Sequence, residues 1–132
     1  MKKVLIIDIN NSTSSIIAEA LINKYLNSLK AYSVGIYPTQ KINSYTIKVL
    51  KRENAWREDY HPKGFDEILD IEFDLVIIIS DIEDNIKEKF PKKVEVISVI
   101  FDEPNKDNFE RFMEVTKEIK EKLLPIVRKK LS

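Results

Sequence analysis

The feature of this sequence that most constrains its fold is a set of short, mainly apolar runs. They are VLII at 4–7, DLVIII at 74–79 and VEVISVI at 94–100, with a weaker run, AYSVGI, at 31–36. Strands buried on both faces of a parallel sheet have such near-continuous apolar sequences, whereas half-exposed strands alternate apolar and polar residues. These runs therefore predict a four-stranded parallel sheet.

Helical patterns occupy the intervals between the runs. Residues 14–29 place most of their apolar side chains on one face, residues 42–53 show a weaker version, and FDEIL at 65–69 begins a short helix. Strands that alternate with helices predict an α/β domain of three layers, with helices on both faces of the sheet. At 132 residues the chain is long enough for one hydrophobic core, so we expect a single domain over residues 1–132.

The last helix has its own start signal. Asp107 is expected to cap it, because Glu110 follows at the spacing of a capping box. Pro125 is expected to kink this helix or to end its regular part, since proline lacks the amide that a helix interior needs. Its expected buried residues are Phe109, Phe112, Met113, Ile119, Leu123 and Ile126.

The loop after the first run, DINNSTSS at 8–15, lies where a site is expected. Ligands of parallel sheets bind at the carboxyl ends of the strands, and the amides at a helix N-terminus attract anions. Asparagine tolerates the left-handed backbone conformation, so it can shape a loop that lacks glycine. The candidate anion-binding residues are Asn10, Asn11, Ser12, Thr13 and Ser15. The simpler alternative is that one of the serines only caps the following helix.

Composition excludes several classes of function. Lys+Arg and Asp+Glu both number 22, so the chain lacks the basic excess expected of a nucleic-acid binder. No apolar run approaches the roughly 20 residues of a membrane span, so we expect a cytoplasmic protein without membrane contact. The absence of cysteine excludes thiolate chemistry, and only two glycines leave no glycine-rich nucleotide loop. We expect no cofactor.

In its order of segments the chain resembles the low-molecular-weight protein tyrosine phosphatase superfamily, and in particular its thioredoxin-coupled arsenate reductases. That family opens with a strand, a loop of Cys, five residues, Arg and Ser/Thr, and a helix that starts near Ala-Glu-Ala. The matching stretch is VLIIDINNSTSSIIAEAL at 4–21, with Asn11, Ser12 and Ser15 at family positions for Asn, Ser and the closing Ser.

Further segments resemble the family in the same order, which implies a phosphotyrosine phosphatase I-like fold. YSVGIYP at 32–38 is similar to its Ser-Ala-Gly-x-x-Pro segment, and HPKGFDEI at 61–68 to its His-x-x-Lys and Leu-Asp-Glu pattern. FDLVIIISD at 73–81 is similar to its Phe-Asp-x-Val-Ile strand. FDEPNKDNFERFMEVTKEIKEKL at 101–123 resembles its Asp-Pro general-acid loop and terminal helix.

The departures from the family fall on its reactive positions. Asp8 stands at the position of the nucleophilic cysteine, Ser14 at that of the phosphate-binding arginine, and Glu103 at that of the general acid, with Asp102 beside it. The family reaction requires a thiolate nucleophile and a guanidinium that holds the phosphoryl oxygens. Cysteine-based phosphatase or arsenate reductase chemistry is therefore excluded. We expect the Asp8 carboxylate to accept hydrogen bonds from amides of residues 10–15 as a built-in anion.

Two functions remain open. The first is a catalytically degenerate member of the family that binds an unknown ligand or protein partner through this loop. The second is a Mg²⁺-dependent phosphohydrolase or phosphotransfer protein that uses Asp8, because IIDINNS resembles the start of haloacid dehalogenase phosphatases. In that alternative the metal would be held by Asp8, Asp81 and Asp84, with Glu83 as a further carboxylate.

Overall fold

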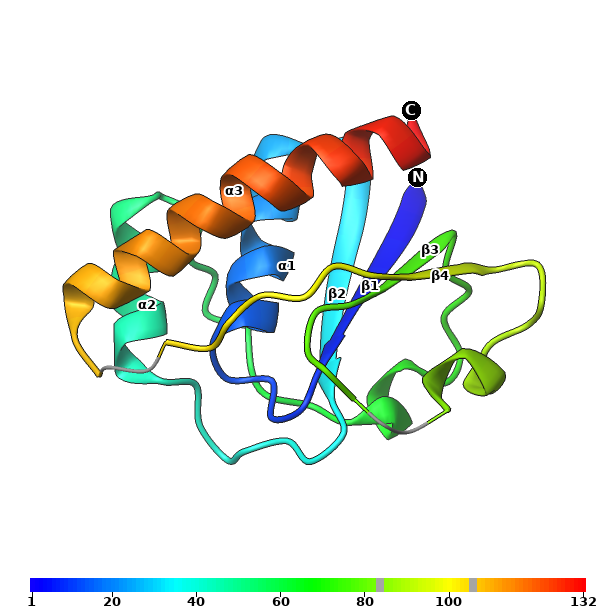
Figure 1. The fold of residues 1–132 in the computed structure, drawn as a ribbon, viewed down its shortest axis with the longest axis horizontal. Coiled ribbons are helices and arrows are strands. Elements are labelled where there is room, and N and C mark those ends of the chain that lie inside the picture. Colours follow the sequence, from blue (N-terminus) through cyan, green and yellow to red (C-terminus); the bar gives the residue numbers. More distant parts are fainter. Residues whose placement is uncertain (83–84, 105–106) are drawn as a thin grey trace.

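The computed structural model describes residues 1–82, 85–104 and 107–132. Its centre is a parallel sheet of four strands in the order β2-β1-β3-β4 (Figure 1). The strands are β1 (Lys2–Asp8), β2 (Leu29–Gly35), β3 (Leu75–Ile78) and β4 (Glu95–Ser98). The predicted four-stranded parallel sheet is confirmed, including the weak run at 31–36.

Helices cover both faces of the sheet, as predicted, but the two layers differ. The helices α1 (Ser14–Tyr25), α2 (Ser44–Arg52) and α3 (Phe109–Leu131) pack on the face that buries Val4 and Ile6 of β1. The 3₁₀ helices η1 (Phe65–Ile68) and η2 (Ile86–Lys89) pack on the opposite face, which buries Leu5 and Ile7. No helix within the described part of the chain is long and apolar enough to cross a membrane.

The helix α1 is enclosed between the sheet and α3, as Figure 1 shows. Every residue from Ser14 to Ile22 is buried, polar ones included. Burial of the apolar residues Ile16, Ile17 and Leu21 fixes the helix against β1, and this fixes the position of its N-terminus at the end of that strand. The short connection between β1 and α1 is therefore held at both ends by the core.

The start of α3 corrects a prediction. The N-cap is Asn108, not Asp107, and the Asn108 side chain accepts a hydrogen bond of 2.8 Å from the Arg111 amide. Both residue types are good caps, so the choice depends on which start brings the apolar face of the helix onto the core. With Asn108 as the N-cap, Phe112 and Val115 of α3 are buried in the core.

The C-terminal end of α3 corrects part of the prediction made for Pro125. The helix passes through Pro125 and continues to Leu131, so Pro125 does not end its regular part, and the alternative of a kink stays a prediction. Pro125 is exposed, so water can bind the carbonyl that loses its amide partner, while Val127 beyond it is fully buried and keeps the last turns on the core. Met113 is exposed, and Phe109 and Ile126 are only half-buried, in contrast to the prediction.

Gly35 allows β2 to approach the loop that follows β1. A Cβ atom at this position would lie 2.9 Å from the backbone atoms Ile9 O, Asn10 C and Asn11 N. We expect Gly35→Ala to lower the free energy of unfolding by about 1–3 kcal/mol, because backbone atoms cannot move aside cheaply. Urea denaturation measures this change.

Gly64→Ala is the matched control. Its added Cβ would meet the Asp66 carboxylate at 3.1 Å, which is the end of a flexible side chain. Its effect should stay within about 0.5 kcal/mol. Equal losses in the two variants would show that the backbone approach at Gly35 is not the cause.

Candidate functional site

The β1–α1 loop, residues 8–13, is held in place by its own carbonyl groups. These carbonyls accept hydrogen bonds from the segment between β2 and α2: Tyr37 N–H to Ile9 O (2.7 Å), Thr39 N–H to Asn10 O (3.0 Å) and Asn43 N–H to Ser12 O (3.2 Å). The Thr46 hydroxyl adds a bond of 3.0 Å to Ser12 O. The loop therefore keeps one shape without any glycine of its own.

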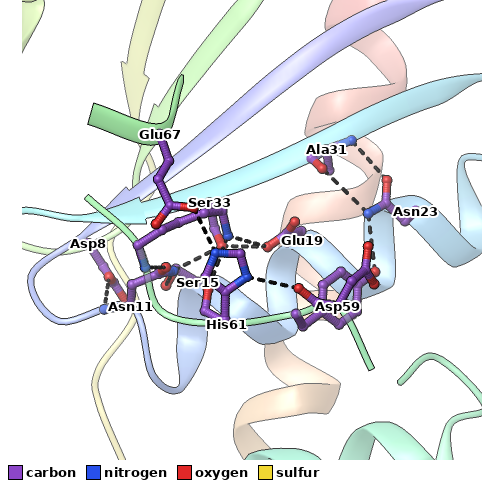
Figure 2. Close-up of polar contacts among 12 residues, drawn as sticks. Asp8, Asn11, Ser15, Glu19, Asn23, Ala31, Ser33, Asp59, His61 and Glu67 are labelled. Carbon is purple, nitrogen blue, oxygen red and sulfur yellow. Dashed lines mark hydrogen bonds and ion pairs between the residues drawn. The ribbon is translucent and has the colours of Figure 1, made fainter. Parts of the chain in front are cut away.

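Asn11 is the central residue of this loop. It is fully buried and has a left-handed backbone, with φ at 52°, as was predicted to be possible for asparagine here. Its side-chain amide donates to Ser15 Oγ (2.8 Å) and Ser33 Oγ (2.9 Å), and its side-chain oxygen accepts from the Lys63 amide (2.9 Å) (Figure 2). One side chain thus joins α1, β2 and the segment before η1.

The network continues into a buried ion pair. Ser33 Oγ donates to Glu19 at 2.5 Å, and the Glu19 carboxylate lies 3.6 Å from Lys63 Nζ, with both residues over nine-tenths buried (Figure 2 labels Glu19 and Ser33). Burial raises the pKa of Glu19, and the nearby Lys63 charge opposes this rise only in part. The pair is linked to the loop through Ser33 and through the Lys63 amide, which both bond to Asn11.

The Asp8 carboxylate occupies the end of β1, facing the N-terminus of α1. One oxygen, Oδ1, accepts a hydrogen bond of 2.7 Å from the Asn11 amide, which confirms the predicted bond to a loop amide (Figure 2). The other oxygen, Oδ2, is buried and has no hydrogen-bond partner, and no ion pair among the described residues includes Asp8. Burial raises the pKa of Asp8, and hydrogen bonds from Ser15 and Asn11 lower it less.

The serines do not cap α1, in contrast to the simpler prediction. The N-cap residue is Thr13, and no side chain makes a cap hydrogen bond. Ser15 instead accepts from Asn11, and Ser12 Oγ donates to the Asn10 side chain at 3.4 Å at the surface. Ser14 Oγ is buried and makes no well-aligned hydrogen bond to the described residues.

Glu103 joins Asp8 and Ser14 from the segment after β4. The Phe101 amide donates to Ile79 O (3.0 Å), which places this segment beside the extension of β3. Burial of the carboxyl group and then the charge of Asp8 raise the pKa of Glu103 to about 7, and the Ser14 hydroxyl lowers it slightly. Residue 103 as a whole is nevertheless exposed, as is Asp102 beside it. The structure therefore brings together three of the four predicted degenerate positions.

The predicted metal ligands are not gathered in the same way. Asp81 is exposed, and Asp84 lies outside the described residues. Within residues 1–82, 85–104 and 107–132 no group of three or more His, Cys, Asp or Glu side chains could hold a metal ion. The set of Asp8, Asp81 and Asp84 stays a prediction.

A cavity of about 920 Å³ lies away from this loop. It is lined by Met1 and Lys3, by residues of η1, by residues 71–74 before β3, and by residues between Lys89 and Val94. Asp8, Ser14 and Glu103 are not part of its lining. Its size is typical of a small-molecule pocket, but most of its lining residues are apolar. We place the candidate site at the loop, because the buried polar groups of Asp8, Asn11 and Ser14 lie there.

The buried ion pair of Glu19 and Lys63 was not predicted from the sequence. Glu19 offered one signal: it lies between Ala18 and Ala20 in a helix of buried residues, and a buried carboxylate requires a partner. The identity of that partner depends on contacts between distant parts of the chain, so Ser33 and Lys63 could not be found from spacing.

Asn11 should carry much of the loop's stability. We expect Asn11→Gly to lower the free energy of unfolding by more than about 2 kcal/mol, because it leaves the buried Lys63 amide without a partner. Asn54→Gly is the control, since Asn54 has φ at 57° but is exposed. Chemical denaturation would contradict this role if the two glycine variants were equally stable.

Glu103 should make stability depend on pH. Its folded pKa of about 7 exceeds the ordinary 4.5, so the folded state binds more protons between these values and loses stability as pH rises toward 7. We expect Glu103→Gln to raise the melting temperature at pH 8 and to change little at pH 5. Asp102→Asn is the control and should show no such difference in melting temperature between the two pH values. A melting temperature raised by Glu103→Gln at pH 5 alone would refute this expectation.

Comparison with known proteins agrees with this architecture. The arsenate reductase of Archaeoglobus fulgidus DSM 4304 is 24% identical, with a TM-score of 0.79 over 95% of this chain and 98% of that chain. An arsenate reductase in the phosphate binding state is 18% identical, with a TM-score of 0.83 over 98% of both chains. A low molecular weight protein tyrosine phosphatase from T. tengcongensis is 18% identical, with a TM-score of 0.81 over 98% of this chain and 99% of that chain.

A search of curated proteins gave no match. The family model described as low molecular weight phosphotyrosine protein phosphatase, however, matches residues 3–131, nearly the whole chain. This agrees with the resemblance seen in the sequence and with the four-stranded parallel sheet. The chain therefore belongs to the low molecular weight phosphotyrosine protein phosphatase family.

Proposed function

We propose that this chain is a non-catalytic member of its family, a single cytoplasmic domain over residues 1–132 that binds a ligand or a protein partner through the β1–α1 loop. The observation that carries the proposal is the buried Asp8 carboxylate, which accepts the Asn11 amide inside the loop. It supplies negative charge at the place where the family's reaction, as the resemblance implies, requires a cysteine thiolate.

The electrostatics of the loop support this proposal. Amides at a helix N-terminus attract one anion, and here the chain provides that anion itself through Asp8. A phosphate or arsenate dianion would meet the like charge of Asp8 and, nearby, that of Glu103 when ionised. Ser14 offers a hydroxyl in place of a guanidinium, so the charge that develops in phosphoryl transfer would lack its usual stabilisation.

We expect no hydrolysis of p-nitrophenyl phosphate above the buffer rate, with or without Mg²⁺. The reason is that the chain has no cysteine and that Asp8 Oδ2 is buried. A steady-state assay measures the rate, and Asp8→Asn and Asp81→Asn serve as comparison variants. Turnover that depends on Mg²⁺ and disappears in Asp8→Asn would overturn the non-catalytic proposal in favour of an aspartate nucleophile.

The double variant Asp8→Cys with Ser14→Arg tests whether the loop keeps the geometry of the family. The loop carbonyls accept hydrogen bonds from residues 37–43, and these bonds use no side chain of Asp8 or Ser14. Among the bonds of Asn11, only the one from its amide to Asp8 Oδ1 uses a side chain that the double variant replaces. We expect the double variant to bind vanadate and to gain measurable hydrolysis. The single variant Ser14→Arg is the control and should gain none, because it lacks a nucleophile.

A further inference from the structure

One face of the sheet has a much thinner cover than the other. The helices η1 and η2 on this face have four residues each, whereas α1 and α3 on the other face have 12 and 23. Several apolar side chains of the thin layer pack against the core and yet stay only partly buried, among them Phe65, Ile71, Phe90 and Val94. The thin layer therefore leaves apolar surface that a bound molecule could cover.

The cavity of about 920 Å³ lies in this thin layer. Its lining includes all four of these partly buried side chains, the buried Phe73, and Leu69, whose exposed fraction is 77%. Pockets that hold small molecules have volumes of roughly 300–1,000 Å³ and mainly apolar walls. Because contact with a ligand would remove the exposed surface of Leu69 from water, the cavity favours an occupant with an apolar body.

The charged groups of the lining have an excess of positive charge. Three lysines, Lys3, Lys89 and Lys93, line the cavity together with two carboxylates, Glu72 and Asp74. None of these five side chains takes part in an ion pair among residues 1–82, 85–104 and 107–132. The Asp74 carboxylate already accepts a hydrogen bond of 2.8 Å from the Lys3 amide. The lining is therefore complementary to one further negative charge.

The lysines combine this charge with apolar contact. The Lys89 ammonium group lies 5.4 Å from the centre of the Phe65 ring, so it stands beside an aromatic wall of the cavity. Lys3 is half-buried, and by the alternation of β1 it lies on the face that buries Leu5 and Ile7. Lysine packs its alkyl stem along apolar surface and keeps its ammonium group at the edge. The cavity thus has apolar walls with ammonium groups at their edge.

We propose that this cavity is a second binding site, and that its ligand is a small amphipathic monocarboxylate. The alkyl chain of the ligand lies against the apolar wall, and its carboxylate contacts Lys89 and Lys93. A single charge matches the excess of one lysine, whereas a dianion would also be repelled by Glu72 and Asp74. The site is separate from the β1–α1 loop, because Lys3 lies near the amino end of β1 and Asp8 at its carboxyl end.

The test is a titration of the full chain with sodium octanoate, followed by the amide NMR shifts of Leu69, Phe73 and Val94. We expect saturable shifts with octanoate. Acetate has the carboxylate without the alkyl body, 1-octanol has the body without the charge, and n-octylammonium has the opposite charge. Each of these controls should bind at least about tenfold more weakly than octanoate. From hexanoate to decanoate, each added CH₂ should lower Kd by roughly two- to fourfold.

Matched pairs of lysines test the role of charge. The double variant Lys89→Gln with Lys93→Gln should raise the Kd of octanoate by about tenfold or more, because it removes two charged partners of the carboxylate. Lys87→Gln with Lys92→Gln is the control, since it removes the same charge from the same stretch of chain but from residues outside the lining. Its Kd should stay within about twofold of the unchanged protein. All four lysines are exposed, so both variants should fold.

Several results would overturn the proposal. Equal effects of the two double variants would mean that octanoate is attracted only by a basic surface. Equal binding of 1-octanol, or a preference for n-octylammonium, would mean that the cavity does not select a carboxylate. The same amide shifts on raising the protein concentration alone, with a dimer in sedimentation equilibrium, would mean that a second copy fills the cavity. No shift with octanoate would also refute the site.

This proposal and the function proposed for the loop can fail separately. The hydrolysis and vanadate experiments test residues 8 and 14, whereas octanoate binding tests a cavity whose lining includes neither residue. Mg²⁺-dependent hydrolysis would remove the non-catalytic function and leave the cavity site standing. Loss of octanoate binding in the double variant at Lys89 and Lys93, with the loop amide of Asn11 unshifted, would support the cavity site whatever the loop binds.

Discussion

The arrangement of the loop depends on one fully bonded side chain, that of Asn11. It accepts the Lys63 amide and donates to two hydroxyls, and its own amide binds Asp8. These bonds hold a left-handed residue inside the core, where an unpaired amide would be strongly destabilising. The left-handed turn of the loop and its side-chain links to Asp8, Ser33 and Lys63 all depend on this one residue.

The sheet could be predicted from the sequence because its signal is local. Near-continuous apolar runs are typical of the strands of a parallel sheet, and even the weak run at 31–36 overlaps β2, which spans Leu29–Gly35. The errors arose where neighbouring residues offer equivalent choices. Asp107 and Asn108, for example, are both good N-cap residues. A separate error concerned Pro125, where the burial of Val127 outweighs the tendency of proline to end a helix.

The candidate site could be predicted only in part for a related reason. The bond from the Asn11 amide to Asp8 spans three residues and could be expected from the sequence. The bonds from Asn11 to Ser33 and Lys63 span 22 and 52 residues, and only the folded chain brings these groups together. Glu103 is an intermediate case, because the family resemblance gave it the position of the general acid, while its raised pKa follows from burial and from the Asp8 charge.

The carbonyl bonds between the β1–α1 loop and residues 37–43 separate the shape of the loop from its chemistry. They use main-chain oxygens of Ile9, Asn10 and Ser12, so the side chains at 8 and 14 contribute little to them. A chain built in this way can exchange its reactive residues without rebuilding its fold. That separation explains how a family architecture can persist here in a protein whose loop carries the carboxylate of Asp8 and the hydroxyl of Ser14.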